Sequence, residues 1–172
     1  MEGRLPLLYP PNYRRCSKVE PNVLQAIVDL TEPLVDWDNI DIILGIEAMG
    51  LPLTAPLAMR TGVPMVIARK RNYGLEGEVQ INQQTGYSKG SIYLNDIKPG
   101  ERIAIIDDVL STGGTMRSVI EGVKQTKASI ENIVIVVEKG DGMQNLKQDY
   151  PSIRFDSLVK LHMDGEKIIV TD

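Results

Sequence analysis

The chain is poor in cysteine, histidine and aromatic residues, and each shortage excludes a class of protein. It has a single cysteine, Cys16, and a single histidine, His162, among 172 residues. One cysteine cannot form an intramolecular disulfide or a four-cysteine zinc site, and the two residues make a cysteine–histidine catalytic pair a poor hypothesis. Aromatic residues are only 5% of the chain, whereas hydrophobic residues are 42%. We therefore expect an aliphatic core that is stable without metals or disulfides.

Long apolar runs and an excess of positive charge are also missing. No run reaches the length of a membrane span, and the first residues, MEGRLPLLYPPNYRR, lack the apolar core of a signal peptide. Nineteen Lys and Arg against 23 Asp and Glu give a net charge of −4. This balance disfavours a general nucleic-acid binder, but it allows a small anion held by a local basic cluster. We expect one cytoplasmic domain, residues 1–172, that binds neither nucleic acid nor membranes.

Four short runs of β-branched and aliphatic residues have the composition of strands buried on both faces. These runs cover residues 40–46, 64–68, 102–106 and 132–137. Apolar residues at helical spacing lie between or before them, at residues 23–32, 51–60 and 115–127. Buried strands that alternate with helices predict an α/β fold with a mainly parallel sheet. Ligands of such sheets bind at the carboxyl ends of the strands.

The segment between the second and third buried runs differs from the rest. Residues 72–90 are polar and contain four glycines, with hardly any periodic apolar residue. A loop of this length inside a compact domain is usually functional, and we expect residues 72–90 to form such a loop. A short strand is expected at residues 91–94, and short strands around a turn are expected at residues 155–170.

The stretch after the third buried run carries the most informative pattern. Asp107 and Asp108 end the run, and Ser111-Thr112-Gly113-Gly114-Thr115 opens the next helix. Backbone N–H groups, a helix N-terminus and hydroxyls that converge at one place suit a phosphate monoester. The two carboxylates repel phosphate and are better suited to a metal ion or to neutral hydroxyls. A phosphate beside a diol and a metal describes a sugar phosphate.

Other interpretations of this stretch fit less well. A P-loop ATPase needs Gly-Lys-Ser or Gly-Lys-Thr, and a dinucleotide-binding fold needs Gly-x-Gly-x-x-Gly after a strand; the chain has neither motif. A response-regulator receiver places its paired acids at the first strand rather than the third. A surface turn with a capped helix would explain residues 111–115 alone, but not their coupling to a strand that ends in two acids.

Residues 105–115, IIDDVLSTGGT, resemble the 5-phosphoribosyl-1-pyrophosphate (PRPP) motif of type I phosphoribosyltransferases. Residues 45–50, GIEAMG, resemble the pyrophosphate loop of this family, and residues 69–75, RKRNYGL, resemble its basic segment after the next strand. Residues 85–90, TGYSKG, are similar to the mobile loop of the archaeal hypoxanthine/guanine enzymes, which are built like adenine phosphoribosyltransferases. The likeness covers roughly residues 39–142.

The resemblance implies the type I phosphoribosyltransferase fold, with a small hood contributed by about residues 1–22 and 140–172. It also implies a transfer of ribose 5-phosphate from PRPP to a purine nitrogen, with release of pyrophosphate and with Mg²⁺ as cofactor. The catalytic acids, which hold the ribose hydroxyls and contact Mg²⁺ partly through PRPP and water, are Asp107 and Asp108. The 5-phosphate is bound by Ser111, Thr112, Gly113, Gly114 and Thr115. The pyrophosphate is bound by the backbone of Ala48, Met49 and Gly50 and by Arg69, Lys70 and Arg71. Residues 72–90 close as a lid that excludes water.

The choice of purine is expected after the fourth buried run, at residues 138–141. In 6-oxopurine enzymes of the family a lysine here donates to O6, and Lys139 occupies a matching position. An ammonium group only donates, which suits hypoxanthine or guanine better than adenine, although an exposed lysine at a strand end would explain Lys139 equally well. Leu158 and Val159 are further candidates for contacts to the base. We expect a homodimeric hypoxanthine/guanine phosphoribosyltransferase of purine salvage that forms IMP or GMP, with adenine specificity as the alternative.

Three departures from the family pattern leave parts of the site open. Ser111 stands where hypoxanthine/guanine enzymes have an acid, and the mobile loop lacks the glutamate of adenine enzymes, so no general acid or base is identified. Met49 stands where adenine enzymes carry arginine, which places more of the cationic role on residues 69–71. A non-catalytic sensor of PRPP or purine is a further alternative, although no helix-turn-helix segment precedes Val23.

Overall fold

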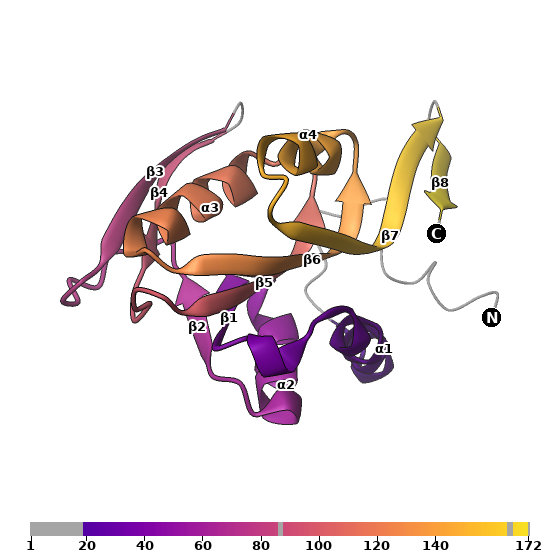
Figure 1. Cartoon of the computed structure of the whole chain (residues 1–172). Coiled ribbons are helices and arrows are strands. Elements are labelled where there is room, and N and C mark those ends of the chain that lie inside the picture. The colour runs from indigo at the N-terminus through magenta and orange to yellow at the C-terminus, as the bar shows by residue number, and fades with distance from the viewer. Residues whose placement is uncertain (1–18, 86–87, 165–166, 172) are drawn as a thin grey trace.

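In the computed structural model, which describes residues 19–85, 88–164 and 167–171, helices cover both faces of a six-stranded sheet (Figure 1). The strands, in spatial order, are β2 (Met65–Ala68), β1 (Ile42–Ile46), β5 (Arg102–Leu110), β6 (Ser129–Lys139), β7 (Arg154–Asp164) and β8 (Lys167–Thr171). The first five pair in parallel, and β8 runs antiparallel to β7. The predicted α/β fold with a mainly parallel sheet is confirmed.

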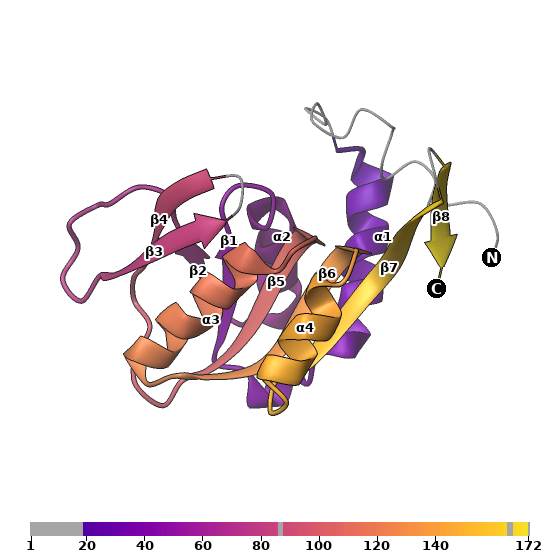
Figure 2. The same ribbon diagram turned by 90° about the horizontal axis from the view of Figure 1, so that it is seen from above.

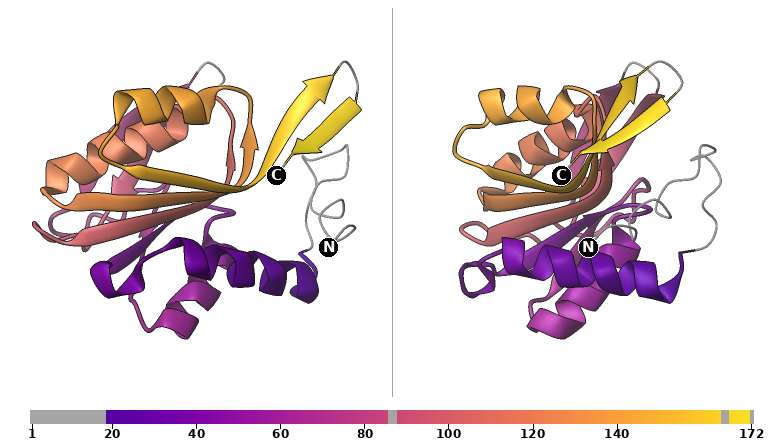
Figure 3. Two further views of the ribbon diagram at one scale, coloured as in Figure 1. Left: turned by 45° about the vertical axis from the view of Figure 1, so that its right-hand side comes forward. Right: turned by 90° about the vertical axis from the view of Figure 1, so that its right-hand side faces the viewer.

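The helices divide into two layers. Helices α1 (Pro21–Thr31) and α2 (Leu51–Thr61) lie on one face of the sheet, and α3 (Gly114–Thr126) and α4 (Gly142–Asp149) lie on the other (Figures 1 and 3). Two short 3₁₀ turns, η2 (Glu32–Leu34) and η3 (Trp37–Asn39), follow α1. Successive strand residues point to opposite faces. Thus Ile106 packs into the α1/α2 layer, whereas Ile105 packs into the α3/α4 layer.

Residues 72–90 differ most from the prediction, because much of this segment is not an irregular loop. Strands β3 (Val79–Thr85) and β4 (Ser88–Leu94) pair antiparallel as a hairpin beside α3 (Figure 1). The side chains of Ile81, Ile92 and Leu94 are buried in the core of the α3/α4 layer. Polar residues occupy most other positions of the hairpin, and so the apolar alternation was too sparse to indicate β3 or the first residues of β4. The strand predicted at residues 91–94 is confirmed as the end of β4.

Two further elements differ from the prediction. Helix α4 was not predicted, because its eight residues bury only Gly142, Met143 and Leu146 and show no extended apolar spacing. Strand β5 does not end at Ile106, since its pairing with β6 continues through Leu110. The two acids therefore lie within a paired strand rather than after it.

The ends of the chain bear on two other expectations. Residues 1–18, including Cys16, lie outside the described residues, and residues 142–160 are continuous with the main sheet and its helices. The hood built from about residues 1–22 and 140–172 stays a prediction. Among the helices of the described residues, none has the length and apolar character to cross a membrane.

Candidate functional site

The carboxyl ends of β1, β2 and β5 bring three of the predicted segments to one edge of the sheet. Ile46 pairs with Ala68, and Gly45 pairs with Ile106, so the residues that follow these strands are neighbours. Gly50 lies against β5 so closely that a Cβ there would be 3.0 Å from the carbonyl oxygen of Ile106. The fold thus places residues 47–50 and 69–71 beside the acid-containing end of β5.

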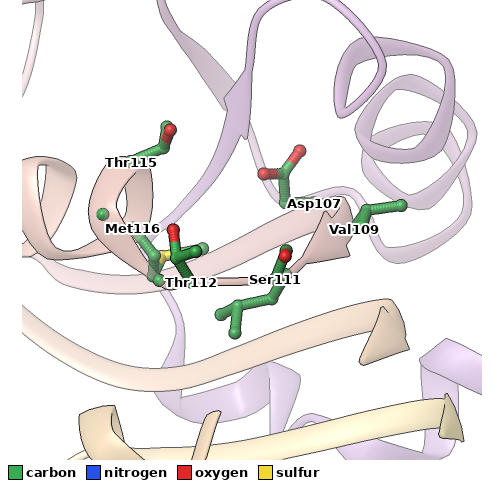
Figure 4. A pocket seen from close by; sticks show the side chains of 9 residues that line it. Asp107, Val109, Ser111, Thr112, Thr115 and Met116 are labelled. Carbon is green, nitrogen blue, oxygen red and sulfur yellow. The ribbon is translucent and has the colours of Figure 1, made fainter. Parts of the chain in front are cut away.

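A pocket at the end of β5, here called the β5 pocket, is lined by Asp107, Val109, Leu110 and residues 111–116. Figure 4 shows the hydroxyls of Ser111, Thr112 and Thr115 and the carboxyl group of Asp107 around this hollow. Helix α3 begins at Gly114, directly after Gly113 in the left-handed conformation with φ 79°. The first N–H groups of a helix have no partner within it. All five residues predicted to bind the 5-phosphate therefore line one pocket.

The two acids line different pockets, although the Asp108 carboxylate is close enough to raise the pKa of Asp107. Asp107 lines the β5 pocket, whereas Asp108 lines a second pocket. The second pocket, here called the apolar pocket, is lined by Val19, Ile27, Met49, Pro52, Leu53, Asp108 and Val136. Apart from Asp108 all of these side chains are apolar, which suits the face of a flat aromatic ring.

Sequence reasoning missed the apolar pocket as a unit. Its lining comes from positions between 19 and 136. Only Met49 and Asp108 belong to segments that the sequence identified as candidate binding sites. Residues contributed one at a time by distant elements leave no local pattern. The apolar patterns of residues 23–32, 51–60 and 132–137 contribute most of this lining, but such patterns indicate burial without indicating a ligand.

The electrostatics of Asp107 reflect its place between the acid pair and the basic segment. Burial, and then the neighbouring Asp108 carboxylate, raises the pKa of Asp107 well above its usual value, while the nearby charge of Lys70 acts in the opposite direction. A cation or hydroxyl donors at this place would favour the ionised form of Asp107. The predicted pyrophosphate-binding Lys70 thus lies close enough to act on a predicted diol-binding acid.

The basic segment is held by two other elements. Arg69 exchanges backbone hydrogen bonds with Tyr93 of β4 (2.9 and 2.8 Å), and its guanidinium lies 4.5 Å from the centroid of the Tyr73 ring. The N–H of Lys70 donates to Oε2 of Glu47 at 2.7 Å. Lys70 and Arg71 are exposed. Glu47, which was not among the predicted site residues, therefore links the segment after β1 to the basic segment after β2.

The backbone of residues 48–50 offers fewer donors than expected. The N–H of Gly50 donates to the carbonyl of Ile46 at 3.0 Å, and so this predicted donor is already engaged. The peptide bond between Glu47 and Ala48 is cis. Ala48 and Met49 are exposed, and the Met49 side chain lines the apolar pocket.

The predicted purine contacts lie outside the lining of both pockets. Lys139 is exposed at the end of β6, where it pairs with Leu161. Leu158 packs in the same apolar layer as Ile27, Leu53 and Val136, which line the apolar pocket, and Val159 is buried. Of the three residues, only Leu158 packs against the apolar cluster that also supplies lining of the apolar pocket.

Magnesium would need ligands from outside the protein. Within the described ranges, no group of three or more His, Cys, Asp or Glu side chains could hold a metal ion. Asp107 and Asp108 supply hard oxygen donors, which Mg²⁺ prefers, but an octahedral ion needs more of them. This donor set fits an ion that is held partly by phosphate oxygens and water.

Comparison with known proteins agrees with the geometry. Residues 18–164 match the model of the phosphoribosyl transferase domain family. The chain is 43% identical over 152 residues to a hypoxanthine/guanine phosphoribosyltransferase of Methanotorris igneus, covering 88% of this chain and 82% of that protein. It is 39% identical over 172 residues to the enzyme of the same name from Aciduliprofundum boonei, covering 100% of this chain and 92% of that protein.

Two solved structures share the fold. An adenine phosphoribosyltransferase from Thermoanaerobacter pseudethanolicus superposes with a TM-score of 0.72 at 25% identity, covering 82% of each chain. One from Rhodothermus marinus superposes with a TM-score of 0.67 at 24% identity, covering 83% of this chain and 81% of that one.

Proposed function

Since the chain belongs to the phosphoribosyl transferase domain family, we propose that it transfers ribose 5-phosphate from PRPP to hypoxanthine or guanine, releasing pyrophosphate and giving IMP or GMP. One observation carries this proposal. The adjacent acids Asp107 and Asp108 join a pocket of hydroxyls and helix N–H groups to an apolar pocket. A reaction between a sugar phosphate and a flat base needs these two pockets to meet at the ribose.

Each part of the site has a role in this transfer. The 5-phosphate lies on residues 111–115, where backbone N–H groups and hydroxyls donate to its oxygens. Asp107 and Asp108 accept hydrogen bonds from the ribose hydroxyls and stabilise positive charge at the anomeric carbon. Lys70 and its neighbours neutralise the negative charge that grows on the leaving pyrophosphate.

The acid pair also fits the proposed Mg²⁺ cofactor. Asp107 and Asp108 would contact the ion, partly through water and PRPP, because they offer two carboxylates and no complete site of their own. When bound, the ion supplies Lewis-acid stabilisation of the pyrophosphate oxygens.

We place the purine ring in the apolar pocket, beside Asp108 and against Met49 and Leu53. Relatives of 39 and 43% identity that are named for hypoxanthine and guanine favour a 6-oxopurine. Lys139, with Leu158 and Val159, stays the proposed source of contacts to the base edge. Adenine is the alternative, supported by structural relatives of lower identity that share the fold.

Residues 72–90 stay the proposed lid of the site, and the described structure shows what they are attached to. Tyr93 of β4 is bonded to Arg69, and so the hairpin is joined directly to the basic segment. Residues 72–78 are held by Glu78, whose Oε2 accepts from the N–H of Tyr73 at 3.2 Å. A lid tied to the pyrophosphate ligands would close over PRPP and exclude water. A cytoplasmic homodimer stays part of the proposal.

The test is an assay of pyrophosphate release. The protein is mixed with PRPP and Mg²⁺ and with adenine, hypoxanthine, guanine or xanthine in turn, and a chelated sample serves as the control for Mg²⁺. We expect release with hypoxanthine and guanine, and loss of release on chelation. Release with adenine alone would establish the alternative. No release with any base would overturn the proposed reaction.

A further inference from the structure

The loop that lines the β5 pocket is in contact with α4 as well as with the pocket. Gly142, the first residue of α4, donates its N–H to the carbonyl oxygen of Ser111 at 3.1 Å. Gly142 is buried, whereas Ser111 and Thr112 are exposed. The loop therefore lies between the pocket and the N-terminal turn of α4.

Gly142 leaves no room for a side chain. A Cβ at this position would lie 2.7 Å from the carbonyl carbon of Thr112 and 2.8 Å from the nitrogen of Gly113, and closer still to the carbonyl oxygen of Ser111. These are backbone atoms, which cannot rotate out of the way as a side chain can. Any other residue at 142 would therefore have to move the loop, the helix or both.

Gly113, on the loop side of this contact, also has little room for a side chain. Gly113 has φ 79°, and a Cβ there would lie 3.3 Å from the carbonyl oxygen of Gly142 and 3.2 Å from Cδ1 of Leu146. Leu146 and Met143 are almost fully buried beneath the loop and beside α3. Two glycines thus let the backbones of the loop and α4 touch in both directions.

Helix α4 is itself fixed to α3, its neighbour on the same face of the sheet (Figure 2). Arg117 forms an ion pair with Asp149 at 2.5 Å, and the Tyr150 hydroxyl donates to Glu121 at 2.9 Å. The ring of Tyr150 also lies under the ammonium of Lys124, which is 4.4 Å from its centroid. These contacts join the C-terminal end of α4 to α3, and α3 itself begins at the loop.

We infer that Gly142, with α4, is a positioning element. It sets how far the backbone of the 5-phosphate loop, residues 111–113, lies from the first turn of α4. The inference rests on the proposed assignment of this loop to the 5-phosphate. Gly142 touches no substrate in this scheme; it acts through the backbone of Ser111 and Gly113. A displaced loop loses its match to the phosphate oxygens, whereas the basic segment and the apolar pocket keep their geometry.

The test compares Gly142→Ala with the wild type by calorimetry, using ribose 5-phosphate and Mg²⁺-pyrophosphate as separate ligands. Because a displaced loop loses hydrogen bonds to a charged phosphate, we expect ribose 5-phosphate to bind roughly 10- to 100-fold more weakly. Pyrophosphate should bind as in the wild type, and the KM for PRPP should rise more than kcat falls. Gln144→Ala, on the exposed face of the same helix, is the matched control and should leave all values unchanged.

The outcomes separate this inference from the proposed function. If the wild type does not bind ribose 5-phosphate, the phosphate assignment fails. If it does and Gly142→Ala binds equally well, or loses both ligands to the same extent while still folded, the positioning role fails. If Gly142→Ala shows no cooperative melting, Leu146→Val is decisive, because it loosens the support under Gly113 without adding atoms. Unchanged ribose 5-phosphate affinity in that variant would overturn the inference.

Discussion

The β5 pocket and the apolar pocket are lined by adjacent residues of β5, yet the chain builds them in different ways. The β5 pocket comes from one continuous segment between Asp107 and Met116. The apolar pocket takes one or two residues from each of several elements, including α1, α2, β5 and β6. A phosphate is bound by consecutive N–H groups and hydroxyls, which one turn can supply. A flat base is bound by apolar surface, which distant elements must enclose together.

The two pockets meet only at the acid pair. Asp107 belongs to the lining of the β5 pocket and Asp108 to that of the apolar pocket. Adjacent positions on a strand give this division without any special loop. The difference teaches that substitutions on the continuous segment should act on PRPP, and substitutions on the scattered lining should act on the base.

The largest effect is expected when each pocket loses its carboxylate in the same variant. Asp107→Asn combined with Asp108→Asn should lower turnover on the order of 1,000-fold, because the ribose hydroxyls and the metal lose their acceptors together. The amides keep the shape of the carboxylates, and so the fold should remain. Pyrophosphate release measures the effect, and normal turnover would show that the acids are not part of the site.

Gly113→Val tests the continuous segment alone. Its Cβ would meet Leu146 and the carbonyl of Gly142, and φ 79° is strained for a β-branched residue. We expect PRPP affinity to fall about 100-fold, with the affinity for free purine preserved. Calorimetry with each ligand checks this, and undiminished PRPP affinity would place the phosphate elsewhere.

Lys139→Ala tests whether a residue outside the lining of the apolar pocket contributes to recognition of the base. A hydrogen bond from a charged group is worth about 1.5–3 kcal/mol, so kcat/KM for hypoxanthine and guanine should fall roughly 10- to 100-fold. Adenine, which has no acceptor at this position, should be little affected. Steady-state kinetics with each base decides the matter. An equal loss for adenine would mean that Lys139 acts on PRPP or on stability.

Met49→Ala separates the two roles of the segment after β1. The substitution keeps the backbone donors proposed for pyrophosphate but removes a wall of the apolar pocket. Losing part of this apolar contact should raise the KM for the purine about three- to tenfold, with the KM for PRPP unchanged. Met59→Ala is the matched control, since Met59 is 87% exposed on α2 and lines neither pocket. A rise in the KM for PRPP instead would assign the side chain to pyrophosphate.

The smallest effect concerns stability and pH. Because the pKa of Asp107 is raised from the usual 3.8, the folded chain binds more protons than the unfolded chain just above that pH. The contribution of Asp107 to the free energy of unfolding therefore falls as the pH rises through this window. Urea unfolding of the wild type and of Asp107→Asn should show that this fall is missing in the variant. Identical pH profiles would mean that the pKa of Asp107 is not raised in the folded chain.

Sequence patterns predicted strands β1, β5 and β6, which are largely buried, and also β2. The prediction that β2 is buried on both faces was wrong, because β2 lies at the sheet edge and buries only Ala68. Strands β1, β2, β5 and β6 contain nearly continuous apolar runs, which are typical of parallel sheets covered on both faces. Strand β3 and helix α4 were missed, and only residues 91–94 of β4 were predicted, because β3 and β4 contribute few buried side chains and α4 is a single short helix. One-sided burial of a few residues is too weak a signal to separate an element from a polar loop.

By itself the sequence predicted the segment proposed to bind phosphate and its two acids, because these functions need particular residue types at consecutive positions. Only the tertiary structure decided that Asp107 and Asp108 belong to different pockets and that Glu47 holds Lys70. It alone decided that Gly142 must be glycine, since no local pattern requires a turn there. These features depend on contacts between segments far apart in the chain, which form only when the parallel strands align.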